Sequence, residues 1–215
     1  MLFEMPKDIK YTYNLDLNDH VAIDTRNDRR IYLTGAINSV GEDEEYGDVS
    51  MCTKIVDDIF DYNRYDEEHQ IPVEERKPIR MYINSPGGSV VEGFPVISAI
   101  ELSKTPVYTI NVGQWSSMAF LIGITGHRRF SLPYMTFLMH DGFNATFDSG
   151  SKAQDKMKFD ERFENEIVKK HVLKRSKMTS VEYDALVRVE YYMLPEDALE
   201  RNVIDEIVTD ITSTL

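Results

Sequence analysis

Three apolar segments, each ending in a polar turn or side chain, follow one another between residues 81 and 140. The first ends in the turn Gly87-Gly88, the second at Ser117 and the third at His140. Helical patterns connect them, and strands alternating with helices over short connections predict a parallel sheet with right-handed crossovers. Ligands of such sheets bind at the edge where the strands' carboxyl ends lie. We therefore expect the turn, the serine and the histidine at one edge.

The rest of the apolar pattern predicts an α/β domain built around this sheet. Residues that favour β-structure indicate strands at residues 30–37, 78–83, 106–112, 129–132, 135–140 and 203–208. Apolar residues at helical spacing indicate helices at about 52–60, 90–102, 117–124, 149–174 and 180–189. The charged, proline-containing residues 64–77 are expected to form a surface loop.

The N-terminal residues differ from the rest in being polar and charged with little periodicity. We expect residues 1–29 to be a segment of uncertain order and residues 30–215 to be a single domain with a sizeable core. Alternating Tyr and Leu residues at 11–17 predict a short strand in the N-terminal segment, and a loosely attached segment is the alternative.

The helix predicted at residues 149–174 is long and highly charged. Its apolar residues form only a thin stripe, namely Ala153, Met157, Phe163, Ile167 and Val172. A helix of this kind buries little surface against its own domain, so we expect it to project and to pack against another subunit.

Composition argues against several classes of function. A net charge of −13 disfavours a nucleic-acid partner, because phosphate binding needs clustered Lys and Arg. No run approaches the roughly 18–20 apolar residues of a membrane helix, and the start does not resemble a secretory signal. The single Cys52 cannot form an intrachain disulfide, which fits a cytoplasmic location. Metal-ligand and Walker-type spacings are absent from the sequence, so we expect no metal or cofactor in this chain, and ATP only through a partner ATPase.

The glycine turn, the serine and the histidine together match what acyl transfer through a serine requires. Amides at Gly87-Gly88 could hold an oxyanion, although two adjacent glycines more often form a simple tight turn. Ser117 stands at a strand-to-helix turn, where it could be a nucleophile with the Met118 amide as a second oxyanion donor. The alternative is a serine that only caps the helix. His140 could be the general base, although a lone histidine is more often structural.

At these residues the chain resembles the ClpP family, the proteolytic subunits of the Clp protease. The resemblance covers about residues 30–207 and is best at residues 82–90, at 117–119 and in the strand that ends at His140. Residues 195–200 with Asp205 resemble the family's closing helix and strand. The resemblance implies the ClpP/crotonase-like α/β fold, a parallel sheet with crossover helices and a projecting handle helix, with the handle region at about 141–175.

The resemblance also implies roles for individual residues. The family's nucleophile falls on Ser117 and its general base on His140. Its two oxyanion-hole amides fall on Gly88 and Met118.

The third member of the family's triad is an Asp shortly before the closing helix. Counting back from residues 196–198 places that position on Glu190, which departs from the family. Glu can orient a histidine as Asp does, but its longer stem must be accommodated. Asp184, six residues earlier on a predicted helix, is the poorer candidate.

Other positions depart from the family as well. Trp115 and Ser116 replace small residues before the nucleophile, and Trp115 either narrows a specificity pocket or fills core space. Asp141-Gly142 replaces the family's Gln-Pro, and Asp141 would favour the protonated form of His140 if the two side chains are close. Two longer segments also depart from the family. One is residues 1–29, which do not match the segment that lines the family's axial entrance, and the other is residues 64–77.

The activity that the resemblance implies is a serine endopeptidase that cleaves unfolded polypeptides inside a closed chamber. The family builds this chamber from two stacked heptameric rings, a tetradecamer, and a separate Clp-type AAA+ unfoldase feeds it. Three alternatives remain open: a ring subunit with weak or no catalysis, a crotonase-type acyl-CoA enzyme, and a signal-peptide-peptidase-like enzyme with a Ser–Lys dyad.

Overall fold

The computed structural model describes residues 29–38, 49–142 and 150–211. Within these ranges the strands form one seven-stranded sheet in the order β1-β2-β3-β4-β7, and β5 pairs with both β3 and β6. The strands are β1 (Arg30–Thr34), β2 (Ile79–Ser85), β3 (Val107–Ser116), β4 (Arg128–Ser131), β5 (Thr136–Met139), β6 (Tyr191–Met193) and β7 (Glu206–Ile207). All pairings are parallel except that of β5 with β6.

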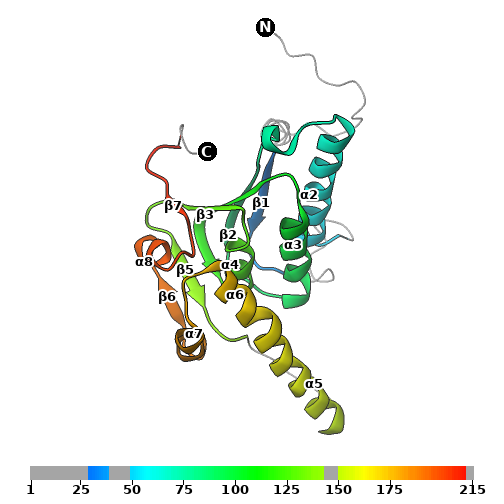
Figure 1. Cartoon of the computed structure of the whole chain (residues 1–215). Coiled ribbons are helices and arrows are strands. Elements are labelled where there is room, and N and C mark those ends of the chain that lie inside the picture. Colours follow the sequence, from blue (N-terminus) through cyan, green and yellow to red (C-terminus); the bar gives the residue numbers. More distant parts are fainter. Residues whose placement is uncertain (1–28, 39–48, 143–149, 212–215) are drawn as a thin grey trace.

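Helices connect and flank the strands (Figure 1). The α-helices are α2 (Met51–Glu68), α3 (Val90–Leu102), α4 (Met118–Gly123), α5 (Gly150–Phe163), α6 (Lys169–Arg175), α7 (Ser180–Leu186) and α8 (Pro195–Glu200). A 3-10 turn, η1 (Val73–Glu75), precedes β2, and a π-helical segment, η2 (Glu164–Val168), joins α5 to α6. The predicted α/β fold with a mostly parallel sheet is therefore confirmed.

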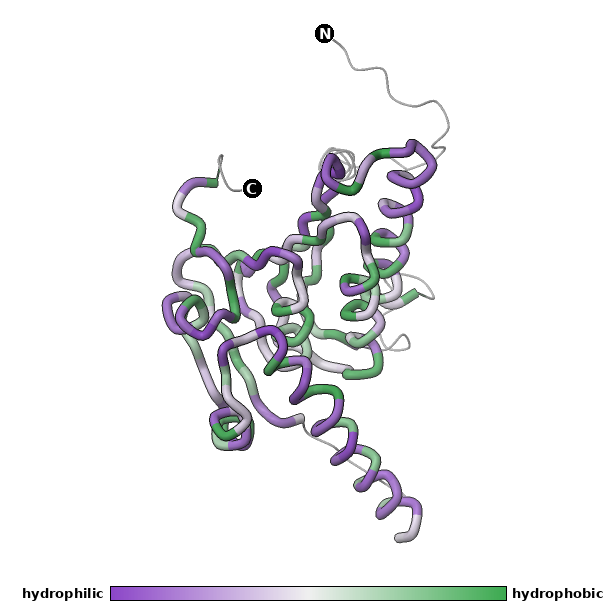
Figure 2. The backbone as a smooth tube through the Cα atoms, in the orientation of Figure 1, coloured by the Kyte–Doolittle hydropathy of each residue, from purple (hydrophilic) through white to green (hydrophobic). Residues whose placement is uncertain are grey.

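The core forms where alternate strand residues meet the crossover helices. Ile79, Met81 and Ile83 of β2 are fully buried and belong to the same cluster as the apolar faces of α2 and α3. Figure 2 shows apolar residues concentrated in the strands and inner helices, while the projecting α5 is mostly hydrophilic. The predicted helix at 90–102 has the bounds of α3, and the other central elements differ from prediction by a few residues.

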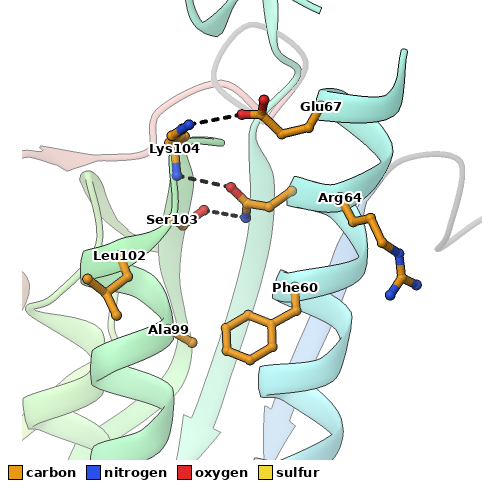
Figure 3. A pocket seen from close by; sticks show the side chains of 8 residues that line it. Phe60, Arg64, Glu67, Ala99, Leu102, Ser103 and Lys104 are labelled. Atoms are coloured by element: carbon orange, nitrogen blue, oxygen red, sulfur yellow. Dashed lines mark hydrogen bonds and ion pairs between the residues drawn. The ribbon is translucent and has the colours of Figure 1, made fainter. Parts of the chain in front are cut away.

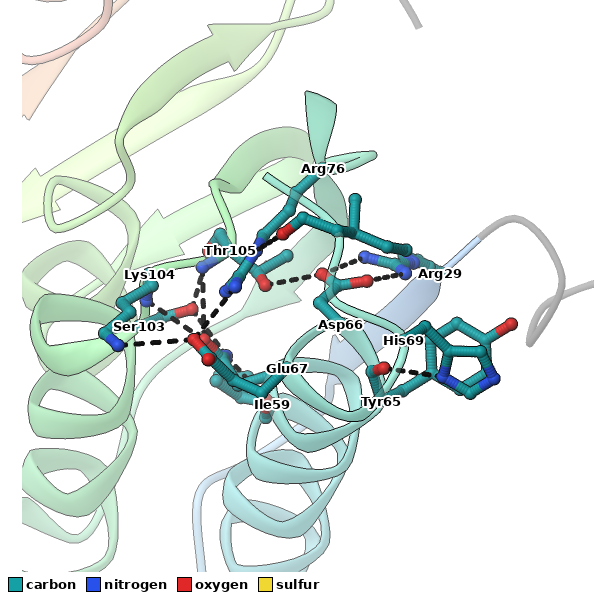
Figure 4. A network of polar contacts seen from close by, with 12 residues as sticks. Arg29, Ile59, Tyr65, Asp66, Glu67, His69, Arg76, Ser103, Lys104 and Thr105 are labelled. Atoms are coloured by element: carbon teal, nitrogen blue, oxygen red, sulfur yellow. Dashed lines mark hydrogen bonds and ion pairs between the residues drawn. The ribbon is translucent and has the colours of Figure 1, made fainter. Parts of the chain in front are cut away.

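The expected surface loop at residues 64–77 is wrong in part, because α2 continues to Glu68 and η1 follows. Tertiary contacts hold this end of α2. The Asp66 carboxylate is fully buried, accepts hydrogen bonds from Arg29 Nη1 at 2.8 Å and Thr105 Oγ1 at 2.7 Å, and lies in the network of Figure 4. Their charge predicts that these residues are exposed to solvent, but the Asp66 side chain is buried and forms an ion pair with Arg29.

The sequence also failed to predict β6, a strand of three residues that pairs antiparallel with β5. A segment this short shows no measurable alternation. The predicted strand at 106–112 is longer in the structure. It continues to Ser116 because residues 114–116 pair with β5 after residues 108–111 have paired with β4.

The long charged helix predicted at 149–174 is present as α5, η2 and α6, and α5 projects from the body of the molecule (Figure 1). No residue of α5 is buried. The anchor lies in α6, where Val172 is buried and the His171 ring nitrogen Nε2 lies 3.0 Å from Thr125 Oγ1. The strand expected near residues 11–17 falls outside the described residues.

Candidate active site

Ser117 stands at a sharp turn between β3 and α4, as its position in the sequence predicts. Its backbone has φ 55° and ψ −124°, a left-handed conformation that costs a non-glycine residue about 1–3 kcal/mol. The Ser117 N–H donates to Leu138 O of β5 at 3.0 Å, which fixes the turn against the neighbouring strand. Its hydroxyl makes no capping hydrogen bond, so the structure does not support a capping role.

The neighbouring serine, Ser116, belongs to the strand β3 and not to the turn. Ser116 ends β3, is buried, and its hydroxyl bonds to Gln114 Oε1 at 3.1 Å. Strained strand-to-helix turns of the Ser117 type expose a hydroxyl at the end of a sheet. Of the two serines, only Ser117 has the backbone of such a turn.

The glycine turn after β2 lies directly against Ser117. A Cβ at Gly87, which has φ 89°, would lie 2.5 Å from Ser116 O, 2.7 Å from Ser117 Cβ and 2.8 Å from Met118 N. No side chain larger than hydrogen therefore fits between the two turns. The glycine is needed for this close approach as well as for its backbone conformation.

Gly88, at φ 143°, is held from its other side. A Cβ there would lie 2.2 Å from Ile37 O, and Ile37 also bonds to the flanking residues through its N–H to Gly87 O at 2.9 Å and its carbonyl to Ser89 N at 2.7 Å. Among the hydrogen bonds of the described residues, none uses the Gly88 N–H. The Met118 N–H opens α4, where the first amides have no partner within the helix.

His140 follows the last residue of β5, and Glu190 precedes the first residue of β6. The antiparallel register pairs Phe137 with Met193, Leu138 with Tyr192, and Met139 with Tyr191. One residue further along, the next two positions are His140 and Glu190. Sheet pairing thus leads both residues to the same place, beside the strand that also accepts the Ser117 N–H.

The two carboxylates considered for the third position of the triad, Glu190 and Asp184, bind different partners. Glu190 is exposed, and its Oε2 accepts a hydrogen bond from the Tyr192 hydroxyl at 2.7 Å. Asp184, the poorer candidate for the third position, forms an ion pair with Lys169 at 2.6 Å on the outside of α7. Sequence reasoning missed Tyr192, whose only signal was its place two residues after Glu190.

The described residues include no hydrogen bond between Ser117 and His140 or between His140 and Glu190. Catalytic hydrogen bonds are often long without substrate and tighten in the complex. What the fold brings together at one edge is the glycine turn, the strained serine, and the strand ends that carry His140 and Glu190.

Trp115 lies beneath the site. It is fully buried, meets Phe137 edge to face with ring centroids 5.3 Å apart, and fills the space beside Gly123. Of the two roles considered for it, filling the core is the one that the structure supports. Asp141, the other nearby departure from the family, is exposed, and its N–H donates to Val187 O at 2.7 Å.

One hollow of the described surface lies away from this edge of the sheet. A depression of about 540 Å³, open solvent included, lies between α2 and α3 and is lined by Phe60, Leu102 and Lys104 among others (Figure 3). It adjoins the C-terminal end of α3, opposite the end that follows the glycine turn. The described residues contain no group of three or more His, Cys, Asp or Glu able to hold a metal, and none of their helices is long and apolar enough to span a bilayer.

The chain matches a protein-family model. The model of the family described as Clp protease matches residues 71–210. This range is more than half of the chain and contains the glycine turn, Ser117, His140 and Glu190.

Proposed function

Because the chain belongs to the Clp protease family and is a ClpP-like peptidase, we propose that it cleaves peptide bonds of unfolded polypeptides by serine chemistry. The observation that carries the proposal is the Ser117 turn. A strained serine, whose hydroxyl makes no capping hydrogen bond to the helix that follows, lies against Gly87 and directly precedes the Met118 amide. Neither core packing nor helix capping accounts for this arrangement, whereas acyl transfer uses it directly.

In the proposed mechanism Ser117 Oγ attacks the peptide carbonyl while His140 takes its proton. The Gly88 and Met118 amides hold the oxyanion, and Glu190 orients the imidazole and balances its positive charge. His140 then protonates the leaving amine. A water, deprotonated by His140, hydrolyses the acyl-enzyme and restores the serine.

The proposal includes the assembly that the family resemblance implies, two heptameric rings stacked around a chamber in the cytoplasm. The exposed apolar side chains of Met157, Phe159 and Ile167 on the projecting helical region support it, since they find no cover within the described chain. Unfolded substrates would come from a separate Clp-type AAA+ unfoldase that supplies ATP hydrolysis, because the sequence has no Walker-type loop.

The test compares Ser117→Ala with Ser116→Ala in cleavage of a fluorescently labelled unfolded protein. Ser117→Ala is expected to reduce kcat by at least about a thousandfold, as loss of a triad nucleophile does, while the assembled mass stays that of the wild type. Ser116→Ala is the matched control and keeps most of the activity, because its hydroxyl bonds to Gln114. Full activity of Ser117→Ala would refute the assignment.

A second candidate is an assembled ring subunit without catalysis. It is motivated by Glu190, which replaces the family's Asp and whose carboxylate is bound by Tyr192. Under this alternative the wild type and Ser117→Ala are equally inactive although both assemble.

A further inference from the structure

Tyr192 is placed beside the proposed triad by strand pairing. It lies on β6 opposite Leu138, on the face away from the core, whereas its neighbour Met193 is buried. The Tyr192 side chain is 61% exposed, so core packing does not explain where its ring lies. Its hydroxyl donates to Glu190 Oε2 at 2.7 Å.

In this hydrogen bond the neutral Tyr192 hydroxyl is the donor and the Glu190 carboxylate is the acceptor. The hydrogen bond to Glu190 raises the pKa of Tyr192 above its ordinary value, so the phenol keeps its proton and remains the donor. The bond occupies one carboxylate oxygen. The other oxygen takes part in no hydrogen bond among the described residues and can accept an N–H from a neighbouring group.

The neighbouring group that the register supplies is the imidazole of His140. His140 and Glu190 each lie one residue beyond Met139–Tyr191, the last pair of this ladder. Directly opposed residues of an antiparallel ladder have Cβ atoms about 5 Å apart, so side chains that leave the ladder at its end start close to one another. A Glu side chain has one more rotatable bond than an Asp and can hold its carboxylate in more positions. Without a second contact, few of these positions would meet the imidazole.

We propose that Tyr192 is a positioning residue, whose hydroxyl holds the Glu190 carboxylate where it can accept a hydrogen bond from His140. The inference rests on the proposed function for its consequences in catalysis. It accounts for a glutamate at a position where the family has an aspartate, because the phenol restrains the longer stem.

The kinetic test compares Tyr192→Phe with Tyr191→Phe, which removes a hydroxyl from the adjacent residue and keeps the ring that packs against Arg201. Tyr192→Phe is expected to lower kcat about threefold to tenfold, the effect of one hydrogen bond to a charged group near the surface, with KM unchanged. Tyr191→Phe leaves both constants unchanged. In a Glu190→Ala background, Tyr192→Phe has no further effect, because Tyr192 acts through Glu190.

Three results would overturn the inference. Faster turnover of Tyr192→Phe would show that the tyrosine withholds the carboxylate. Unchanged turnover would show that the contact is irrelevant. A loss of the same size in the Glu190→Ala background would show that Tyr192 acts by another route.

A second measurement does not depend on activity. The NMR signal of the His140 ring, in protein labelled with 13C-histidine and assigned through His140→Gln, is expected to shift in Tyr192→Phe and in Glu190→Ala. It is expected to stay unchanged in Tyr191→Phe. A shift in a protein that cleaves nothing would leave the positioning role standing and end the proposed function. An active protein without the shift would overturn the positioning role and leave the proposed function standing.

Discussion

At the scale of single residues, the site is defined by how closely two turns approach one another. Ser117 adopts a positive φ, and the Cα of Gly87 fills the space beside it so fully that an added Cβ would lie within 2.8 Å of three atoms. The strain at Ser117 is stable only because β5 and the glycine turn fix it from both sides.

Gly87→Ala tests this approach directly. The new methyl group must push the Ser117 turn and the Met118 amide away from the glycine turn, so we expect kcat to fall by at least about a hundredfold, the cost of a lost oxyanion donor. Gly35→Ala is the matched control. Gly35 also has a positive φ, 78°, but nothing lies within 4 Å of its added Cβ, so it shares the backbone strain without the collision. Equal losses in the two variants would contradict the close-approach argument.

At the scale of elements, β3 and α4 are fitted to each other through Trp115 and Gly123. The indole occupies the position beside Gly123, where an added Cβ would lie 2.4 Å from ring atoms. A large residue before the nucleophile is therefore accommodated by a missing side chain at the end of the next helix.

Gly123→Ala should therefore destabilise the protein. Overpacking a buried ring costs about 1–3 kcal/mol, and this exceeds the helix-propensity gain of less than about 1 kcal/mol at a helix terminus. The measurement is the urea unfolding midpoint at a fixed protein concentration. Gly150→Ala, with nothing within 4 Å of its added Cβ, should leave the midpoint almost unchanged. A midpoint for Gly123→Ala as high as that of the wild type would contradict the fit.

The C-terminal end of α2 depends on the buried pair of Asp66 and Arg29. Burial alone would raise the pKa of Asp66, but hydrogen bonds from Arg29 and Thr105, together with the charge of Arg29, outweigh it and hold that pKa below its ordinary value. A folded-state pKa below the unfolded one means that stability is present above the unfolded value and is lost as pH falls through the folded one.

Asp66→Asn should lower the unfolding free energy by about 3–5 kcal/mol at pH 7, because it leaves Arg29 buried without a counter-charge. The difference from the wild type should be constant down to about pH 5 and should shrink below about pH 4, because Asp66 takes up a proton in the unfolded wild type before it does so in the folded protein. Urea unfolding from pH 7 to 3 measures it. Asp61→Asn is the control, since the exposed pair with Arg64 should contribute less than about 1 kcal/mol. A difference that stays constant to pH 3 would contradict the account.

The sequence predicts long elements well and short ones poorly. Long apolar runs such as β3 and α3 were predictable, and with them the edge where Ser117 and His140 lie. The strand β6 was not, because three residues carry no period, and neither was the Tyr192–Glu190 contact that depends on it. The extension of α2 was missed because a buried ion pair, and not local composition, stabilises it.

At the scale of the whole molecule, α5 is the element whose exposed apolar side chains the described part of the chain does not cover. It projects from the domain, has no buried residue, and exposes Met157 and Phe159 among many charged side chains. Apolar side chains at these positions fit a helix that is covered by a second ring.

Charged substitutions on α5 test the proposed stacking. Met157→Glu and Phe159→Glu should each halve the mass of the assembled protein, from two rings to one, because a charge would have to be buried at the contact. Sedimentation velocity measures the mass. Val73→Glu places the same charge on an exposed apolar residue of η1, far from α5 in the sequence, and should leave the assembly intact. Wild-type mass for both α5 variants would contradict a ring contact through this helix.

The central claim is that Ser117 is a nucleophile activated by His140. Reaction of the purified, assembled protein with a fluorophosphonate probe, followed by peptide mapping, tests it most directly because neither substrate nor unfoldase is needed. We predict a covalent adduct on Ser117 that is lost in His140→Ala. The absence of any adduct from a folded, assembled protein, or an adduct that forms equally well in His140→Ala, would contradict the claim.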